Sequence, residues 1–217
     1  MSPAQAAVGR FDPGILYYAP QGWTSDDTDA AERVKIQYGT SMCYPVSSMG
    51  SHVSVVPNHQ LNRKTPLHTR ANVAYFGTFG YELDLNKLSD EEISEVKQQI
   101  TFMKEYRELI QFGTFYRLKS PFEGNETVWM TVSEDKKTAL VFWYRERNVV
   151  NADFTRVRLQ GLDPDIIYRN EYNGTENYGD ELMNLGLLTT DCTAGEPTSE
   201  DEPCTDYESR IYVLTAK

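Results

Sequence analysis

Several features are scarce in this sequence of 217 residues, and each absence narrows the class of protein. No apolar run approaches the ~18 residues that a membrane-spanning helix needs, so no membrane partner is expected. The N-terminus, Met1–Val8, lacks the basic start and the apolar core of a signal peptide. Basic residues number 21 against 32 acidic ones, so the basic surface that binds phosphates is missing and no nucleic-acid partner is expected.

Lys and Arg are missing altogether between Asn170 and Ser209. The acidic residues of this segment account for the whole net charge of −11. A solvated acidic surface is the ordinary interpretation of such a segment, and a calcium site built from its carboxylate oxygens is the alternative.

Cysteine and histidine are rare, with three residues of each. Cys43 has apolar neighbours and is expected to be a small buried side chain. Cys192 and Cys204 bracket a segment rich in Pro, Ser, Thr and acids, where a disulfide and a pair of free thiols remain open alternatives. The histidines are irregularly spaced and do not fit a zinc site, so no metal ion and no cofactor are expected.

Two kinds of feature bear on the location of the parent protein, namely glycosylation sequons and a pair of cysteines. Two glycosylation sequons begin at Asn125 and Asn173, although such tripeptides often arise by chance. Together with a possible disulfide they favour an extracellular parent protein.

The first half of the sequence predicts alternating strands and helices. Strands are expected at Ile15–Trp23, Met42–Val46 and Asn72–Phe79. Asp29 with Glu32 predicts the start of a helix that continues to Gln37 and is stopped by Gly39. Ser89 with Glu92 forms a capping box at the start of the longest helix, Ser89–Gln111.

After Gly113 the pattern changes to short strands. Thr127–Ser133 and Thr138–Tyr144 predict a hairpin around a charged turn. Further strands are expected at Phe115–Leu118, Arg156–Leu159, Ile166–Arg169 and Ile211–Leu214. The sequence therefore predicts an α/β region up to residue 113 and an antiparallel β-sandwich after it.

The segment after the first expected strand favours carboxylate chemistry. Trp23 is followed closely by Asp26, Asp27 and Asp29. A strand with this ending delivers carboxylates to the carboxyl edge of a sheet, where clefts form. The plainer alternative for Asp26 is a capping acid at a helix N-terminus.

These residues resemble the family-36 glycoside hydrolases, the α-galactosidases of the melibiase kind. The resemblance extends from Gly9 to the C-terminal region and depends on the order and density of its motifs. These are Gly9–Gly14, Trp23–Asp29, Ile36–Ser41, Ser47–Ser54, Pro57–Gln60, Phe76–Asp84, Gly161–Pro164 and Gly179–Met183.

The resemblance implies an architecture. Residues 1–113 would contain the last three βα units of a (β/α)8 catalytic barrel, and residues 114–217 the C-terminal antiparallel β-sandwich domain. The expected class is thus α/β plus all-β. Exposed barrel edges would favour self-association, so a homo-oligomer is expected.

The resemblance also implies a retaining hydrolysis of α-galactoside sugars by two aspartates, in which Asp26 matches the general acid/base. Trp23 would contact the sugar or raise the pKa of that acid. Gly9 and Arg10 would be the remnant of a substrate-recognition turn.

One element of the family pattern is absent. The nucleophile of such enzymes lies in a Lys-Trp-Asp segment, and this sequence contains no Lys-Trp pair. The isolated chain is therefore expected to be inactive. The alternative function is a non-catalytic carbohydrate-binding or assembly module, in which Trp129 or Trp143 could stack on sugars, although core packing is the better interpretation of both.

Overall fold

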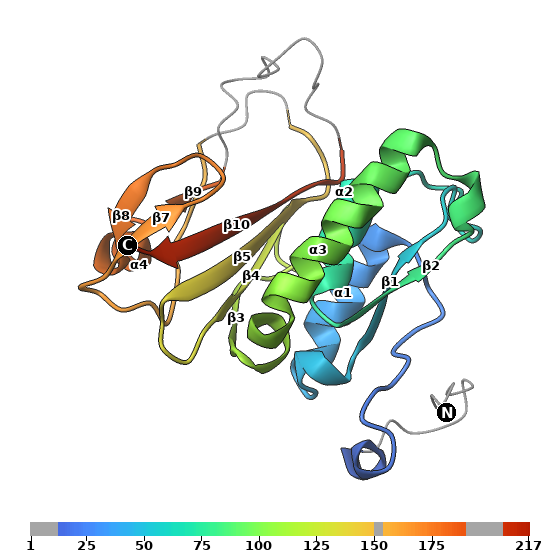
Figure 1. The fold of residues 1–217 in the computed structure, drawn as a ribbon, viewed down its shortest axis with the longest axis horizontal. Coiled ribbons are helices and arrows are strands. Elements are labelled where there is room, and N and C mark those ends of the chain that lie inside the picture. The colour runs from blue at the N-terminus through green and yellow to red at the C-terminus, as the bar shows by residue number, and fades with distance from the viewer. Residues whose placement is uncertain (1–12, 150–153, 190–205) are drawn as a thin grey trace. The chain divides into compact units, whose positions relative to one another are not determined.

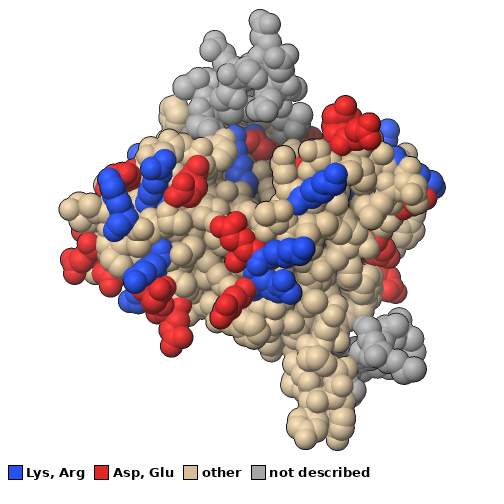
Figure 2. Space-filling view, viewed as in Figure 1, with Lys and Arg blue, Asp and Glu red and all other residues tan. Residues whose placement is uncertain are grey.

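The computed structural model describes residues 13–149, 154–189 and 206–217. The chain divides into two compact units, Met1–Phe112 and Gly113–Lys217, which are considered separately (Figure 1). Within the described ranges, no helix is both long and apolar enough to span a membrane. On the face shown in Figure 2, basic and acidic side chains are mixed, without a continuous basic area.

The first unit is built from parallel β/α units. Strands β1 (Gly50–Ser54) and β2 (Thr78–Glu82) pair in parallel, with His52 opposite Gly80. Gly22 adds a third parallel position through a bridge to Met49. Helices α1 (Ala30–Thr40) and α2 (Leu67–Tyr75) form the two crossovers, and α3 (Asp90–Phe112) follows β2 (Figure 1). Short 3-10 helices are η1 (Pro13–Tyr17), η2 (Val46–Ser48) and η3 (Leu85–Lys87).

Side-chain caps define the starts of two helices, as the sequence predicts. Asp29 caps α1, and its carboxylate accepts a hydrogen bond from the backbone N–H of Glu32 at 3.1 Å. The Ser89 hydroxyl accepts from the N–H of Glu92 at 3.2 Å, and the Glu92 carboxylate accepts from the N–H of Ser89 at 2.9 Å. These bonds satisfy N–H groups that a helix leaves without a partner in its first turn.

Three predicted strands are misplaced. Between Ile15 and Trp23 only Gly22 pairs with a neighbour, and η1 occupies the start of the range. Met42–Val46 contains a turn and the first residue of η2, since Pro45 has no N–H for a strand ladder, and the strand lies later, at β1. The run Asn72–Phe79 contains the end of α2 and the start of β2, since a short apolar run fits a buried helix as well as a strand.

The misplaced second strand also explains an error about Cys43. This residue was expected to be buried, but it lies in the turn after α1 and is an exposed free thiol. Gly39 does not stop α1, which continues to Thr40. Cys192 and Cys204 lie outside the described residues.

The second unit is the predicted antiparallel β domain. Its six-stranded sheet has the order β3-β4-β5-β10-β7-β8, and all its pairings are antiparallel. The strands are β3 (Thr114–Lys119), β4 (Glu126–Val132), β5 (Thr138–Arg145), β7 (Ile167–Asn170), β8 (Glu176–Tyr178) and β10 (Glu208–Ala216). A second sheet pairs β6 (Arg156–Val157) with β9 (Leu187–Leu188), and α4 (Gly179–Asn184) precedes β9.

The core of this unit lies between the two sheets. Val128, Met130 and Val141 of the large sheet form one buried cluster with Val157 and Leu187 of the small sheet. Every second residue of β4 and β5 contributes to this cluster, as a pleated strand requires. The two layers correspond to the sandwich that the short strands predict.

The aromatic residues of the β4-β5 hairpin are buried rather than available to a sugar. Trp129 and Trp143 are each 1% exposed, and Phe142 stacks on Trp129 with ring centroids 4.3 Å apart. A sugar cannot stack on a ring that the protein already covers. Core packing is therefore the role of these side chains, and the hypothesis of an aromatic sugar-binding face is wrong.

Candidate active site

Three parallel strand positions bring three carboxyl ends to one edge of the first unit. Gly22, β1 and β2 run in the same direction, so the residues that follow each of them meet at this edge. The segment Trp23–Asp29 continues directly from Gly22 into α1. In α/β folds this edge is where ligand clefts are built.

Asp26 lies in this segment with its side chain exposed to solvent. The residues on either side are held by local hydrogen bonds. The Ser25 hydroxyl accepts from the N–H of Asp27 at 3.1 Å, and the Asp27 carboxylate accepts from the N–H of Asp29 at 2.9 Å. The backbone around Asp26 is thus fixed, while its carboxylate remains accessible to a substrate.

The side chain of Arg33, on α1, holds the same segment through hydrogen bonds. One of its terminal nitrogens donates to the Gly50 carbonyl at 2.7 Å and to the Thr24 hydroxyl at 3.1 Å, and the other donates to the Ser25 carbonyl at 3.3 Å. Burial lowers the pKa of Arg33 to about 10, and the charges of Asp27 and Glu82 oppose that shift. The guanidinium therefore stays charged at neutral pH.

Trp23, His52 and Gly80 form a row across the three strand positions. The rings of Trp23 and His52 lie 4.5 Å apart at 32°. Gly80 is opposite His52, and a Cβ at Gly80 would lie only 2.8 Å from the imidazole, so a larger residue there would displace the imidazole from this position. Ser51 donates to Gln37 of α1 at 2.9 Å, so β1 turns its His52 face away from α1.

His52 is half-buried in this row. Burial lowers the pKa of its imidazole, and the nearby charge of Arg33 lowers it further. The imidazole is consequently neutral at neutral pH and can pack against the indole of Trp23 without carrying a charge.

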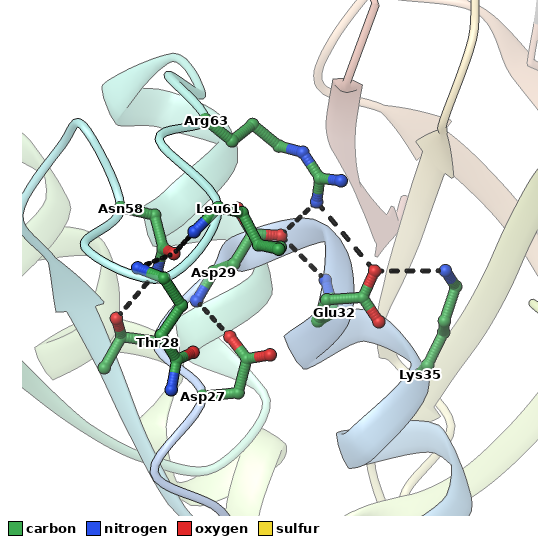
Figure 3. A network of polar contacts seen from close by, with 9 residues as sticks. Asp27, Thr28, Asp29, Glu32, Lys35, Asn58, Leu61 and Arg63 are labelled. Atoms are coloured by element: carbon green, nitrogen blue, oxygen red, sulfur yellow. Dashed lines mark hydrogen bonds and ion pairs between the residues drawn. The ribbon is translucent and has the colours of Figure 1, made fainter.

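The loop after β1 is fastened to the start of α1 (Figure 3). Asn58 donates to the hydroxyl of Thr28 at 3.0 Å, and its own carbonyl accepts from the N–H of Leu61 at 2.9 Å. Arg63 forms a salt bridge with the carboxylate of Asp29, which is almost fully buried. The two segments that follow the first two strand positions are therefore held together.

The structure describes two of the four predicted site residues. Trp23 and Asp26 lie in one segment at the carboxyl edge, as expected, whereas Gly9 and Arg10 lie outside the described residues. Arg33 and His52 were not predicted as parts of this site. The sequence did contain a signal for Arg33. It is a basic residue in the first turn of a helix whose N-cap is the acid Asp29.

The described part of the chain contains few side chains of the kind that bind metal ions close to one another. There, no three His, Cys, Asp or Glu side chains are grouped so that they could hold a metal ion. Residues 190–205 of the acidic segment are outside that part.

Comparisons with known proteins agree with this architecture. The Melibiase family model matches residues 3–113, and the model of the glycosyl hydrolase family 36 C-terminal domain matches residues 126–214. The α-galactosidase AgaA of Geobacillus stearothermophilus is 57% identical over 179 residues, which cover 82% of this chain and 24% of that protein. The bifunctional α-galactosidase/sucrose kinase AgaSK of Mediterraneibacter gnavus is 51% identical, over 82% of this chain and 19% of that protein.

Solved structures show the same relationship. The crystal structure of AgaA superposes with a TM-score of 0.88 at 51% identity, covering 96% of this chain and 27% of that one. Other crystal structures of AgaA contain raffinose or stachyose. The α-galactosidase of Lactobacillus brevis also superposes with a TM-score of 0.88, at 48% identity.

The chain therefore belongs to glycoside hydrolase family 36, the melibiases. It spans about a quarter of the length of the curated relatives that it matches, and the match lies in their C-terminal portion.

Proposed function

We propose that this chain supplies the proton-donating part of the active site of a retaining α-galactosidase, with Asp26 as the general acid/base. The observation that carries the proposal is the position of Asp26. It is exposed at the carboxyl end of a parallel strand position in a family-36 chain, with the backbone on both sides held by hydrogen bonds.

The proposed reaction uses two carboxylates. A nucleophile attacks the anomeric carbon while Asp26 protonates the departing glycosidic oxygen, and Asp26 then takes a proton from the water that releases galactose. Retention requires the two carboxyl groups to be ~5–5.5 Å apart. Trp23, Gly9 and Arg10 are proposed to contact the sugar. The proposed substrates are raffinose-type α-galactosides, because related crystal structures contain raffinose and stachyose.

The proposed domain roles follow from the same family membership. Residues 1–113 would form the C-terminal portion of the catalytic (β/α)8 barrel, and residues 114–217 the β-sandwich domain that follows it in the sequence. The nucleophile would come from a part of the full protein that is not in this sequence, since no Lys-Trp pair occurs here.

The first experiment measures hydrolysis of an aryl α-galactoside by the 217-residue chain. We expect negligible turnover, because one of the two carboxylates is missing. Ordinary turnover by the pure chain would contradict the proposal, since it would require a nucleophile among these residues.

The second experiment tests Asp26 in the full-length protein that contains this sequence. Asp26→Asn should lower kcat on raffinose by about 10²–10⁴-fold, the usual contribution of general acid catalysis. The loss should be smaller on an aryl galactoside, whose leaving group needs less protonation. Asp27→Asn is the matched control, because an amide oxygen there can still accept from the N–H of Asp29. Equal losses on both substrates, or a larger loss in the control, would refute the role of Asp26.

A further inference from the structure

A cavity of about 530 Å³ opens in the second unit, where β3 ends, β4 begins and β5 ends. Its volume is within the range of small-molecule pockets. The polar side chains that line it include Lys119, Ser120, Asn125, Glu126, Arg145 and Thr155. None of them belongs to the strand ends that carry Trp23 and Asp26.

The charges in this cavity are largely compensated within the protein. Lys119 donates to Glu126 at 2.5 Å, and Arg145 donates to Glu208 at 2.5 Å. The second oxygen of Glu126 accepts from the indole of Trp143 at 3.1 Å and from the hydroxyl of Thr155 at 3.0 Å. An anion would meet Glu126 and a cation would meet Lys119 and Arg145, so the chemistry favours a neutral, polar ligand.

The polar groups are held in place, which favours binding. The side-chain amide of Asn125 donates to the carbonyl of Arg147 at 2.7 Å and accepts from its N–H at 2.9 Å. The guanidinium of Arg145 lies 5.5 Å from the ring of Trp143, and Arg145 is only 5% exposed. Among the described residues, its buried Nε has no hydrogen-bond acceptor.

Two exposed aromatic residues occur next to lining residues in the sequence. Phe122, 67% exposed, precedes Glu123, and Phe154, 61% exposed, precedes Thr155. Both rings are thus exposed on segments that also supply lining residues of the cavity.

We propose that this cavity binds a neutral carbohydrate without cleaving it, as a site separate from the active site. Hydroxyl groups of a sugar can both donate and accept, so they match a lining that presents Lys, Arg, Asn, Ser and Thr groups together with carboxylates. The charged partners strengthen those hydrogen bonds, and the fixed side chains reduce the entropic cost of binding. The site therefore recruits or holds oligosaccharide on the β domain.

The test is calorimetric titration of the 217-residue chain with raffinose and, separately, with glucose. We expect saturable binding of at least one sugar with millimolar affinity and little change with salt, because the ligand carries no charge. Gly124→Trp should weaken this binding about tenfold or more. Gly124 lines the cavity, and an added Cβ there meets no atom within 4 Å, so the indole can occupy the open space without disturbing the fold.

Gly39→Trp is the matched control, because Gly39 also has open space for a side chain but lies on α1 of the first unit. Asp26→Asn should leave the binding unchanged, so the result does not depend on the proposed catalytic role. Failure of both sugars to bind would overturn the proposal. Binding that survives Gly124→Trp but is lost in Trp23→Ala would place the sugar at the strand ends and would overturn it as well.

Discussion

At the strand ends of the first unit, the buried guanidinium of Arg33 affects both the position of the backbone and the protonation of a neighbouring side chain. Arg33 donates hydrogen bonds to the carbonyls of Ser25 and Gly50, and its charge adds to the burial that lowers the pKa of the neighbouring His52. Neither effect involves the exposed carboxylate of Asp26 directly. Arg33 is thus a positioning residue for the segment that carries the proposed acid.

The neutral state of His52 gives a pH-dependent prediction. In the unfolded chain the imidazole protonates near its ordinary pKa of ~6.5, whereas in the fold protonation occurs at lower pH because of burial and Arg33. The unfolded state therefore binds more protons in this window, and the stability from neutral His52 is lost as pH falls below ~6.5.

An NMR titration of the imidazole resonances measures this directly. We expect the pKa of His52 to lie below its ordinary value, because burial and the charge of Arg33 both lower it. A His52 pKa at or above ~6.5 would show that the packing against Trp23 does not exclude the charged form.

At the scale of elements, the helices begin where local side chains satisfy the first N–H groups. The longest helix, α3, begins at a complete capping box, and that is why its start agrees with the sequence prediction to within one residue. The strands of the first unit have no comparable local signal. Their placement depends on which apolar run finds a parallel neighbour.

The capping box gives a prediction about stability. Ser89→Ala should lower the free energy of unfolding by about 1 kcal/mol, because the N–H of Glu92 loses its acceptor. Urea denaturation followed by circular dichroism measures the change. Ser94→Ala in the exposed interior of the same helix should cause no loss, since alanine is the better helix former. Equal behaviour of the two variants would mean that the cap contributes nothing.

At the scale of the whole molecule, the first unit presents apolar surface that predicts self-association. Tyr17 is 87% exposed and Tyr18 is 82% exposed, and their rings contact each other at 5.0 Å. Within the described residues, β2 has only β1 as a neighbour, so one of its edges is open.

We therefore expect the molar mass of the chain in solution to rise with concentration, as measured by light scattering after gel filtration. Replacing both tyrosines in Tyr17→Ser/Tyr18→Ser should shift the chain toward monomer. A wild-type chain that stays monomeric at high concentration would contradict this prediction.

The sequence by itself determined the features that depend on local chemistry. The caps at Asp29 and Ser89, the hairpin at Glu134–Lys137 and the change from β/α units to antiparallel strands near Gly113 all follow from neighbouring residues. The order and density of the motifs were also sufficient to indicate the family, which the comparisons confirm.

Only the tertiary structure decided the features that depend on residues distant in sequence. Short apolar runs such as Asn72–Phe79 fit a helix or a strand equally. In the folded chain this run contains the end of α2 and the start of β2, a result that depends on tertiary packing. The contacts of Arg33 with Gly50 and of Trp23 with His52 join residues on different elements, and the cavity beside Glu126 and Arg145 is formed by strand ends that meet only in the folded sheet. No local sequence pattern predicts such contacts, because the residues that form them come together, and stabilise the fold, only when the chain has folded.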